Sequence, residues 1–263
     1  MPSKTPEPQL LAHRYQLQQL LGKKAGRQTW LAKDLPTEAW VVVKLLTFGA
    51  EFEWDDLRLF EREAQVLQSL SHPAIPQYLD YFEVDLPTGR GFALVQSYIQ
   101  ARSLEQHLKA GRNFSEGEVK QIARDLLEIL IYLHDRQPPV IHRDIKPSNI
   151  LLGAGEACVE RTRSDNSPGQ VYLVDFGAVQ TLLAKEGSTM TIVGTYGYMP
   201  PEQFGGRAFP ASDLYSLGAT LIYLVTGQHP ADLQDDLRIE FQSQANLSPA
   251  FAHWLHRMTA PSR

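Results

Sequence analysis

The chain has little cysteine, no long hydrophobic run and no excess of positive charge. Its single cysteine, Cys158, excludes an intramolecular disulfide and is typical of a protein from a reducing compartment. The longest apolar stretch, Leu214 to Val225, is interrupted by Ser216, Gly218 and Thr220, which argues against a membrane span. The net charge of −5 gives no reason to expect nucleic acid or an anionic membrane surface as a partner.

The N-terminus also lacks the features of a targeting segment. Residues Met1 to Pro8 contain three prolines and no apolar core, so they are not a signal peptide. The chain has 263 residues, 43% hydrophobic and 21% charged, which is enough for a sizeable core in one or two domains. We therefore expect a soluble cytoplasmic protein in which residues 1–14 form a flexible N-terminal segment.

The octapeptide His142 to Asn149 combines a carboxylate, an ammonium group and an amide within a few residues. Its Lys146-Pro147 step disfavours a regular helix, because proline pushes the preceding residue out of the helical region, so we expect a short irregular loop. Asp144 can accept a proton from a hydroxyl nucleophile, Lys146 can neutralise a moving phosphoryl group, and Asn149 can hold a metal ion. The pattern is typical of phosphoryl transfer; the alternative is a polar loop that happens to contain these residue types.

A second motif, Asp175-Phe176-Gly177, follows the octapeptide. Together the two motifs resemble those of the eukaryotic-like (Hanks-type) Ser/Thr protein kinases, and their sequences are most similar to those of bacterial, cyanobacterial members. The resemblance runs from Tyr15 to near the C-terminus and implies an α+β fold, the bilobal protein kinase fold. We expect a small β-rich N-lobe with one helix over residues 15–98 and a larger, mainly helical C-lobe over 99–263. A further helix is expected where the chain stops at Arg263, which suggests a trimmed domain of a longer protein.

One lysine stands in an apolar strand pattern, Val41 to Leu46. A lysine in such a run is costly unless it is paired, and the resemblance implies that Lys44 holds the α- and β-phosphates of ATP and pairs with a helix glutamate. The pattern over Asp55 to Leu70 has a helical period and carries Glu63 at the family's usual distance from Lys44. Glu61 is a rival that falls on another face of the helix, so we favour Glu63.

The loop that covers the phosphates in the family departs from its G-x-G-x-x-G pattern. Gly22 fills the first position, Lys24 and Arg27 stand at the second and third, and Gly26 comes one place early. Glycines there let the backbone approach the phosphates closely. We expect a turn over 22–26 between strands at 15–21 and 29–32. The cations of this segment are Lys23, Lys24 and Arg27. They either supply charge near the triphosphate or form a solvated basic turn.

Other positions take their expected roles from the resemblance. In the hinge, main-chain groups of Ser97 and Ile99 are implied to meet the adenine of ATP. Asn149 and Asp175 are implied to hold Mg²⁺, which seldom uses an all-protein cage. Thr195 is implied to shape the acceptor site, and Asp213 to brace the catalytic-loop backbone.

Three further segments carry expectations of their own. Gly153 to Gln170 is a polar insertion, interpreted as a lengthened hairpin loop that either docks a partner or is inert. Gln180 to Ile192 resembles an activation segment, closing at Pro200-Pro201-Glu202, and its phosphorylation candidates are Thr191, then Thr189 and Ser188. Ser115 to His134 reads as a long helix with a capping box. His134 and His142 are interpreted as packing or loop residues.

The predicted reaction is transfer of the γ-phosphoryl group of ATP to Ser/Thr hydroxyls of proteins, including the kinase itself. Lysine two places after Asp144 favours Ser/Thr specificity. One alternative is a pseudokinase-like nucleotide-binding interaction module, suggested by the degraded glycine loop. Another is a small-molecule phosphotransferase of related fold, although such enzymes generally lack Asp-Phe-Gly and the segment closing at Pro201-Glu202. No nucleic-acid or membrane partner is expected.

Overall fold

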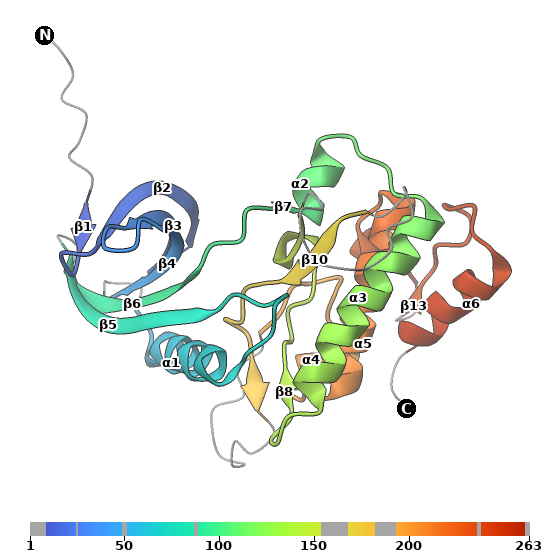
Figure 1. Cartoon of the computed structure of the whole chain (residues 1–263). Coiled ribbons are helices and arrows are strands. Elements are labelled where there is room, and N and C mark those ends of the chain that lie inside the picture. The colour runs from blue at the N-terminus through green and yellow to red at the C-terminus, as the bar shows by residue number, and fades with distance from the viewer. Residues whose placement is uncertain are drawn as a thin grey trace, which may run out of the picture. The chain divides into compact units, whose positions relative to one another are not determined.

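A computed structural model describes residues 9–24, 26–48, 52–86, 89–153, 168–181, 193–235 and 238–260 of the chain (Figure 1). The chain divides into two compact units, Met1–Ile99 and Gln100–Arg263, named unit 1 and unit 2 below. Among the described residues, no helix combines the length and the hydropathy that a membrane span requires.

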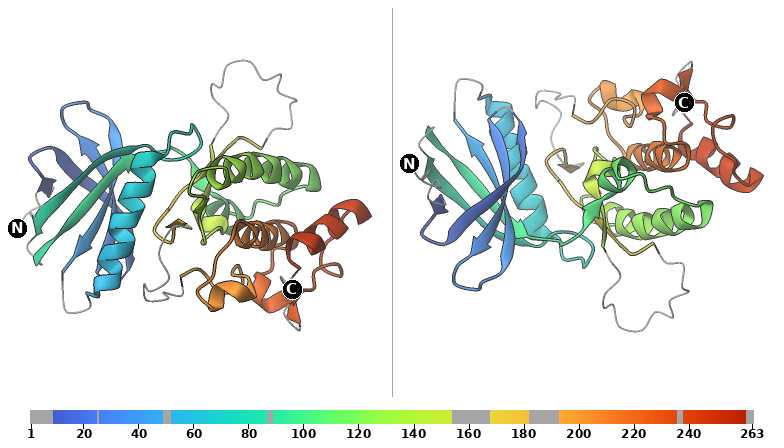
Figure 2. Two further views of the ribbon diagram at one scale, coloured as in Figure 1. Left: turned by 90° about the horizontal axis from the view of Figure 1, so that it is seen from below. Right: turned by 90° about the horizontal axis from the view of Figure 1, so that it is seen from above.

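Unit 1 is an antiparallel sheet with one helix on it. The six strands lie in the order β1-β2-β3-β4-β6-β5, and Figure 2 shows the helix α1 along one face of the sheet. The elements are β1 (Leu10–Leu11), β2 (Tyr15–Lys24), β3 (Arg27–Asp34), β4 (Trp40–Thr47), α1 (Trp54–Ser69), β5 (Tyr78–Leu86) and β6 (Gly89–Ser97).

Strand β4 explains how the sheet buries both of its faces. Successive side chains of a strand point to opposite faces, so Val41, Val43 and Leu45 join a hydrophobic cluster with Tyr15 and Leu17 from β2. The opposite set along β4 comprises Val42, Lys44 and Leu46 and faces α1, where Lys44 meets a glutamate. A nearly continuous apolar run therefore forms a strand covered on both sides, with one charge placed under the helix.

The structure differs from the expected flexible segment at residues 10–14. Leu10 and Leu11 pair with Gln16 and Tyr15 as β1, and Leu11 is only 2% exposed. The Arg14 guanidinium donates to Asp34 Oδ1 at 2.7 Å. An apolar side chain and a charge pair thus attach this part of the N-terminus to the sheet.

Unit 2 is built mainly from helices around α5. Its elements are β7 (Arg102–Ser103), α2 (Leu104–Lys109), α3 (Glu116–His134), β8 (Val140–Ile141), β9 (Ile150–Gly153), β10 (Gln170–Leu173), β11 (Gln180–Thr181), α4 (Pro201–Phe204), α5 (Pro210–Thr226), β12 (Gln234–Asp235), β13 (Arg238–Ile239) and α6 (Pro249–Met258), with 3₁₀ turns at Pro147–Asn149 and Pro230–Leu233. Helices α3 and α5 lie side by side, and α5 is buried on most of its surface.

The long helix α3 begins and ends where its sequence predicts. Ser115 Oγ accepts from the Glu118 main-chain N–H, and Glu118 Oε2 accepts from the Ser115 N–H at 2.8 Å. This is a capping box, which pairs two backbone donors that a helix start otherwise leaves unsatisfied. The apolar stripe, from Val119 to Leu133, packs into unit 2.

The polar insertion stands between two paired strands. Gly153 of β9 lies opposite Gln170 of β10, as the interpretation of a lengthened hairpin requires. Residues 154–167 of the insertion lie outside the described residues.

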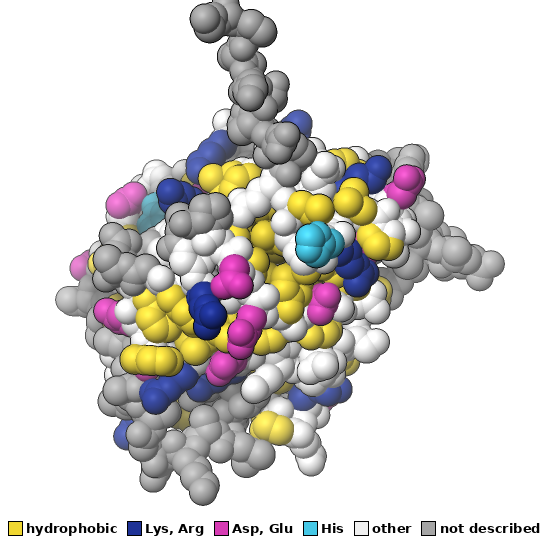
Figure 3. Space-filling model, turned by 90° about the vertical axis from the view of Figure 1, so that its left-hand side faces the viewer, with side chains coloured by type: hydrophobic (Ala, Val, Ile, Leu, Met, Phe, Trp, Pro, Cys, Tyr) yellow, Lys and Arg dark blue, Asp and Glu magenta, His cyan; other side chains and the backbone are white. Residues whose placement is uncertain are grey.

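On the surface, the face shown in Figure 3 carries Lys and Arg side chains as well as Asp and Glu side chains, next to hydrophobic ones.

Candidate active site

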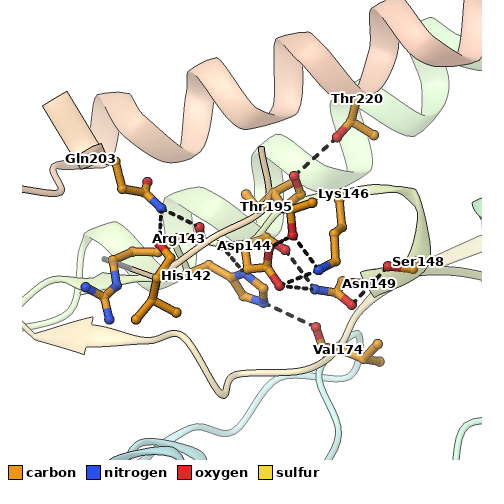
Figure 4. Close-up of polar contacts among 12 residues, drawn as sticks. His142, Arg143, Asp144, Lys146, Ser148, Asn149, Val174, Thr195, Gln203 and Thr220 are labelled. Atoms are coloured by element: carbon orange, nitrogen blue, oxygen red, sulfur yellow. Dashed lines mark hydrogen bonds and ion pairs between the residues drawn. The ribbon is translucent and has the colours of Figure 1, made fainter. Parts of the chain in front are cut away.

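The carboxylate of Asp144 is the centre of a compact polar cluster in unit 2 (Figure 4). Its Oδ2 accepts from Lys146 Nζ at 2.7 Å, and its Oδ1 accepts from the Thr195 hydroxyl at 2.7 Å. Lys146 Nζ also donates to Thr195 Oγ1 at 2.7 Å. The side chains of Asp144 and Lys146 are 13% and 17% exposed, so the pair is shielded but reachable. This arrangement offers a carboxylate base beside a fixed cation.

Asn149 is held beside this carboxylate by the 3₁₀ turn Pro147–Asn149. Its Nδ2 donates to the main-chain oxygen of Asp144 at 2.8 Å and to Oδ2 at 3.1 Å. The amide oxygen Oδ1 lies 3.4 Å from Ser148 Oγ, a contact long enough to leave this oxygen able to bind a cation.

Asp175 is brought near Asn149 through the backbone. The N–H of Val174 donates to the main-chain oxygen of Asn149 at 2.9 Å, and Asp175 is the next residue. Asp175 has φ 65°, a left-handed conformation uncommon for a residue other than glycine. An amide oxygen and a carboxylate are ligands that suit Mg²⁺, which takes only one or two from the protein. Among the described residues, no group of three or more His, Cys, Asp or Glu side chains could form an all-protein cage.

A buried carboxylate on α5 supports the backbone of the loop. Asp213 is 0% exposed; its Oδ2 accepts from the His142 N–H at 2.9 Å and its Oδ1 from the Arg143 N–H at 2.8 Å. Arg143 has φ 67°, so these bonds hold a strained conformation directly before Asp144. His134, at the end of α3, places Nε2 2.9 Å from the same Oδ2. His134 therefore has a supporting role that its interpretation as a packing residue missed.

His142 links the loop to the strand that ends at the second motif. Burial lowers its pKa, so the ring is neutral and carries one proton. The Asp144 N–H lies 3.3 Å from Nδ1, so Nδ1 is the acceptor and Nε2–H donates to the Val174 main-chain oxygen at 3.2 Å. The ring packs edge-on against Phe176, with centroids 4.9 Å apart. A packing histidine thus also fixes the spacing between the two motifs.

The Arg143 side chain runs towards the segment after Asp-Phe-Gly. Its Nε donates to the main-chain oxygen of Ala178, and its Nη1 donates to Gln180 Oε1 at 3.1 Å. The three phosphorylation candidates, Ser188, Thr189 and Thr191, lie outside the described residues, so docking of a phosphate on Arg143 stays a prediction.

Sequence reasoning missed Gln203, one residue beyond the closing motif. Its Nε2 donates to the main-chain oxygens of Arg143 at 2.8 Å and Val193 at 2.6 Å, and the residue is 2% exposed. Glutamine is common on surfaces, and its closeness to Pro201-Glu202 was the one available signal. Gln203 joins the catalytic loop to the segment that carries Thr195.

In unit 1, Lys44 and Glu63 form the expected pair. Lys44 Nζ lies 2.5 Å from Glu63 Oε1, with the side chains 12% and 2% exposed. Glu63 is on the buried face of α1. Burial of both partners makes each depend on the other, since an unpaired charge there would be costly.

The expected phosphate loop is shorter than its sequence indicated. Strands β2 and β3 continue to a pair between Lys24 and Arg27, so a turn over 22–26 is wrong for 22–24, which belong to β2. Gly26 keeps a left-handed φ of 64°, as a tight turn requires. Around Gly22 there is open space within 4 Å of the position a Cβ would take. Cross-strand pairing thus extends the hairpin where the family has a glycine-rich loop.

The hinge residues end unit 1. The Ser97 N–H donates to the Gln77 main-chain oxygen at 2.9 Å, and Ser97 Oγ accepts from the Gln77 N–H at 2.8 Å. The main-chain group that Ser97 can offer to an adenine is therefore its carbonyl. Ile99 is the last residue of unit 1.

The site thus combines a carboxylate, a cation and two oxygen-bearing side chains, and the family of the chain is shown by comparison with known proteins. Residues 15–258 match the protein kinase domain, and the chain belongs to that family. It is 36% identical to Serine/threonine-protein kinase B of Synechocystis over 93% of this chain and 43% of the relative. It is 35% identical to Serine/threonine-protein kinase PknA of Nostoc over 96% of this chain and 44% of the relative.

Both relatives are serine/threonine-protein kinases from cyanobacteria, the type of kinase that the sequence resembles. The chain spans less than half the length of these curated relatives. Kinases of this family generally use ATP and Mg²⁺ and act on proteins.

Proposed function

We propose that this domain transfers the γ-phosphoryl group of ATP to serine or threonine hydroxyls of proteins, including its own. The observation that carries the proposal is the cluster of Asp144, Lys146 and Thr195. A hydroxyl group already lies 2.7 Å from Asp144 Oδ1, which is the distance a proton donor to a base needs.

Each side chain has one task in the transfer. The acceptor oxygen attacks the γ-phosphorus, its proton passes to the Asp144 carboxylate, and the bond to the β-phosphate oxygen breaks to release ADP. Lys146 Nζ neutralises charge on the transferring group, and Lys44, kept in place by Glu63, binds the α- and β-phosphates. Asn149 and Asp175 would hold Mg²⁺, which when bound offsets the charge of the phosphate oxygens.

The expected nucleotide site lies along the hinge and the phosphate hairpin of unit 1, and one contact supports its adenine end. The Ser97 carbonyl and the Ile99 main chain would meet the adenine, because the Ser97 N–H already bonds to Gln77. Gly22, Lys24 and Gly26 would lie along the triphosphate.

A cytoplasmic location and the lack of nucleic-acid or membrane partners stay predictions from the single cysteine and the net charge of −5.

The test is an acceptor comparison with radiolabelled ATP and Mg²⁺. We expect label on casein or on the kinase itself, and none on small alcohols or aminoglycosides. Label on a small molecule alone would identify a small-molecule phosphotransferase. Nucleotide binding without transfer to any acceptor would identify a pseudokinase. A map of phosphosites by mass spectrometry then gives the acceptor residues.

A further inference from the structure

Arg27, which stands at the third glycine position of the phosphate loop, reaches the start of α1. Its Nη2 lies 2.9 Å from Asp56 Oδ1 and 3.0 Å from the Asp56 main-chain oxygen. The two side chains are 27% and 33% exposed. The charge that the sequence assigned either to the triphosphate or to solvent is therefore paired with a carboxylate of unit 1.

The strand register explains why Arg27 points at the helix. Arg27 lies opposite Leu46 on β4, and Thr29 lies opposite Lys44. Residues directly opposite each other, and those two apart along a strand, share one face of a sheet. Arg27 and Lys44 therefore project from the same face, the one that α1 covers.

The two carboxylates on α1 are matched to these two cations. Asp56 and Glu63 are seven residues apart, about two turns, and so lie on one face of the helix. Arg27 holds this face near its N-terminal end, and Lys44 holds it two turns later. The Gly26 main-chain oxygen also accepts from the Thr47 N–H at 2.9 Å, which ties the hairpin tip to the end of β4.

We propose that Arg27 is a positioning residue, which acts through Asp56 to set the place of α1 and hence of Glu63 and Lys44 Nζ. Where the family has a flexible glycine, this chain has an ion pair between Arg27 of the phosphate hairpin and Asp56 of α1, which we name the strap. The inference rests on the proposed function, because the pair that it positions is the one that binds the phosphates of ATP. A change at Arg27 thus reaches Lys44 through α1.

A mutant cycle tests the strap against a direct contact with phosphate. The variants are Arg27→Ala, Asp56→Ala, the double alanine variant, and the charge exchange Arg27→Asp with Asp56→Arg. Arg58→Ala is the matched control, since Arg58 pairs with Asp55 at 3.3 Å on the same helix turn and makes no hydrogen bond or ion pair with the described residues of the hairpin. The readouts are kcat and KM for ATP, the Kd of ATP-Mg²⁺ and Tm.

Each single alanine variant should lower kcat/KM for ATP about tenfold, the scale on which residues of one ion pair couple. The double variant should be no worse than either single one, the charge exchange should restore most of the rate, and Arg58→Ala should match wild type. Normal rates for Asp56→Ala, with a raised KM for Arg27→Ala, would overturn the strap in favour of a phosphate contact. A lower Tm with unchanged kinetics below melting would overturn it in favour of a purely structural pair.

The proposed function and the strap fail in different ways. If the wild-type chain transfers no phosphate, the proposed function is wrong, and the same cycle is then read from the Kd of ATP-Mg²⁺. Equal losses of affinity in the two single variants, without a further loss in the double variant, still support the strap. Additive losses contradict it.

Discussion

The catalytic loop of unit 2 keeps the sequence pattern of the family, whereas the phosphate hairpin of unit 1 departs from it. The loop keeps every charged or amide side chain of the pattern, and two of these side chains, Lys146 and Asn149, bond to the Asp144 carboxylate. The hairpin has lost two of three glycines, and its strands pair as far as Lys24 and Arg27. Side-chain chemistry cannot be supplied by another residue type, whereas a backbone contact can be replaced or given up. The two regions should therefore differ in their tolerance of substitution.

The largest expected effect is at Asp144. Asp144→Asn keeps the shape of the side chain but removes the base, so phosphoryl transfer should fall by roughly 10²–10⁴-fold, the usual scale for loss of a general base. Single-turnover rates and the Kd of ATP-Mg²⁺ measure the two properties separately, and the Kd should change little. Asp135→Asn, an exposed change at the end of α3, is the control. Turnover near that of wild type in Asp144→Asn would remove the proposed role.

The support behind the loop should matter next. Asp213→Asn replaces one of two acceptor oxygens with a donor that faces a backbone N–H, so a buried N–H loses its partner. Turnover should fall about tenfold and the free energy of unfolding by about 1–3 kcal/mol, the range for an unsatisfied buried group. Urea unfolding and initial rates measure both effects. If only stability changed, Asp213 would hold the fold and not the catalytic geometry.

A switch at the activation segment should have an effect of several-fold. A phosphate on Thr191, with Thr189 second, carries about −1.5 to −2 charges at pH 7 and can bond to Arg143, which now reaches Gln180. Initial rates of phosphatase-treated and untreated enzyme, and of Thr191→Ala, should show higher activity in the phosphorylated form. Equal rates, with no phosphate detected on residues 188–191, would exclude the switch.

Salt should separate the two cations that stand at glycine positions of the hairpin. Lys24 is exposed, as is its neighbour Lys23, whereas Arg27 is paired with Asp56, so of these two cations Lys24 is the one available as a point charge for the triphosphate. Exposed charges are screened within about 10 Å at 0.1 M salt, so Lys24→Gly should reduce the salt dependence of ATP affinity. Arg27→Gly should leave the salt slope closer to that of wild type. Identical slopes in all three proteins would make Lys24 an ordinary surface charge.

The smallest expected effect is a loss of stability in mild acid. Burial lowers the pKa of His142 and of His107 from the ordinary value of 6.5. Below about pH 6.5 the unfolded chain therefore binds protons that the folded chain does not. The free energy of unfolding consequently decreases as the pH is lowered. Urea unfolding between pH 8 and 5.5 should show a smaller slope in His142→Gln. His253→Gln, an exposed histidine on α6, should keep the wild-type slope.

The sequence by itself predicted the features that depend on local pattern and residue type. The capping box of α3 and the apolar strand with one lysine follow from local spacing, and Glu63 follows from a helical period together with the family's usual distance from Lys44. The motif at Asp144 and the family follow from residues that phosphoryl chemistry requires by type. Backbone geometry fixes which residues a few positions apart lie on the same face of a helix or strand. Such features can therefore be predicted from the spacing of residue types in the sequence.

Only the tertiary structure decided which common polar residues meet over long separations. Arg27 and Asp56 are 29 positions apart, His134 and Asp213 are 79, and Gln203 and Arg143 are 60. Each of these residue types is also frequent on surfaces, so no spacing rule singles them out. Their partners are chosen by strand register in unit 1 and by the packing of α3, α4 and α5 in unit 2, because a buried polar atom must find a bonding partner in whatever its fold brings near.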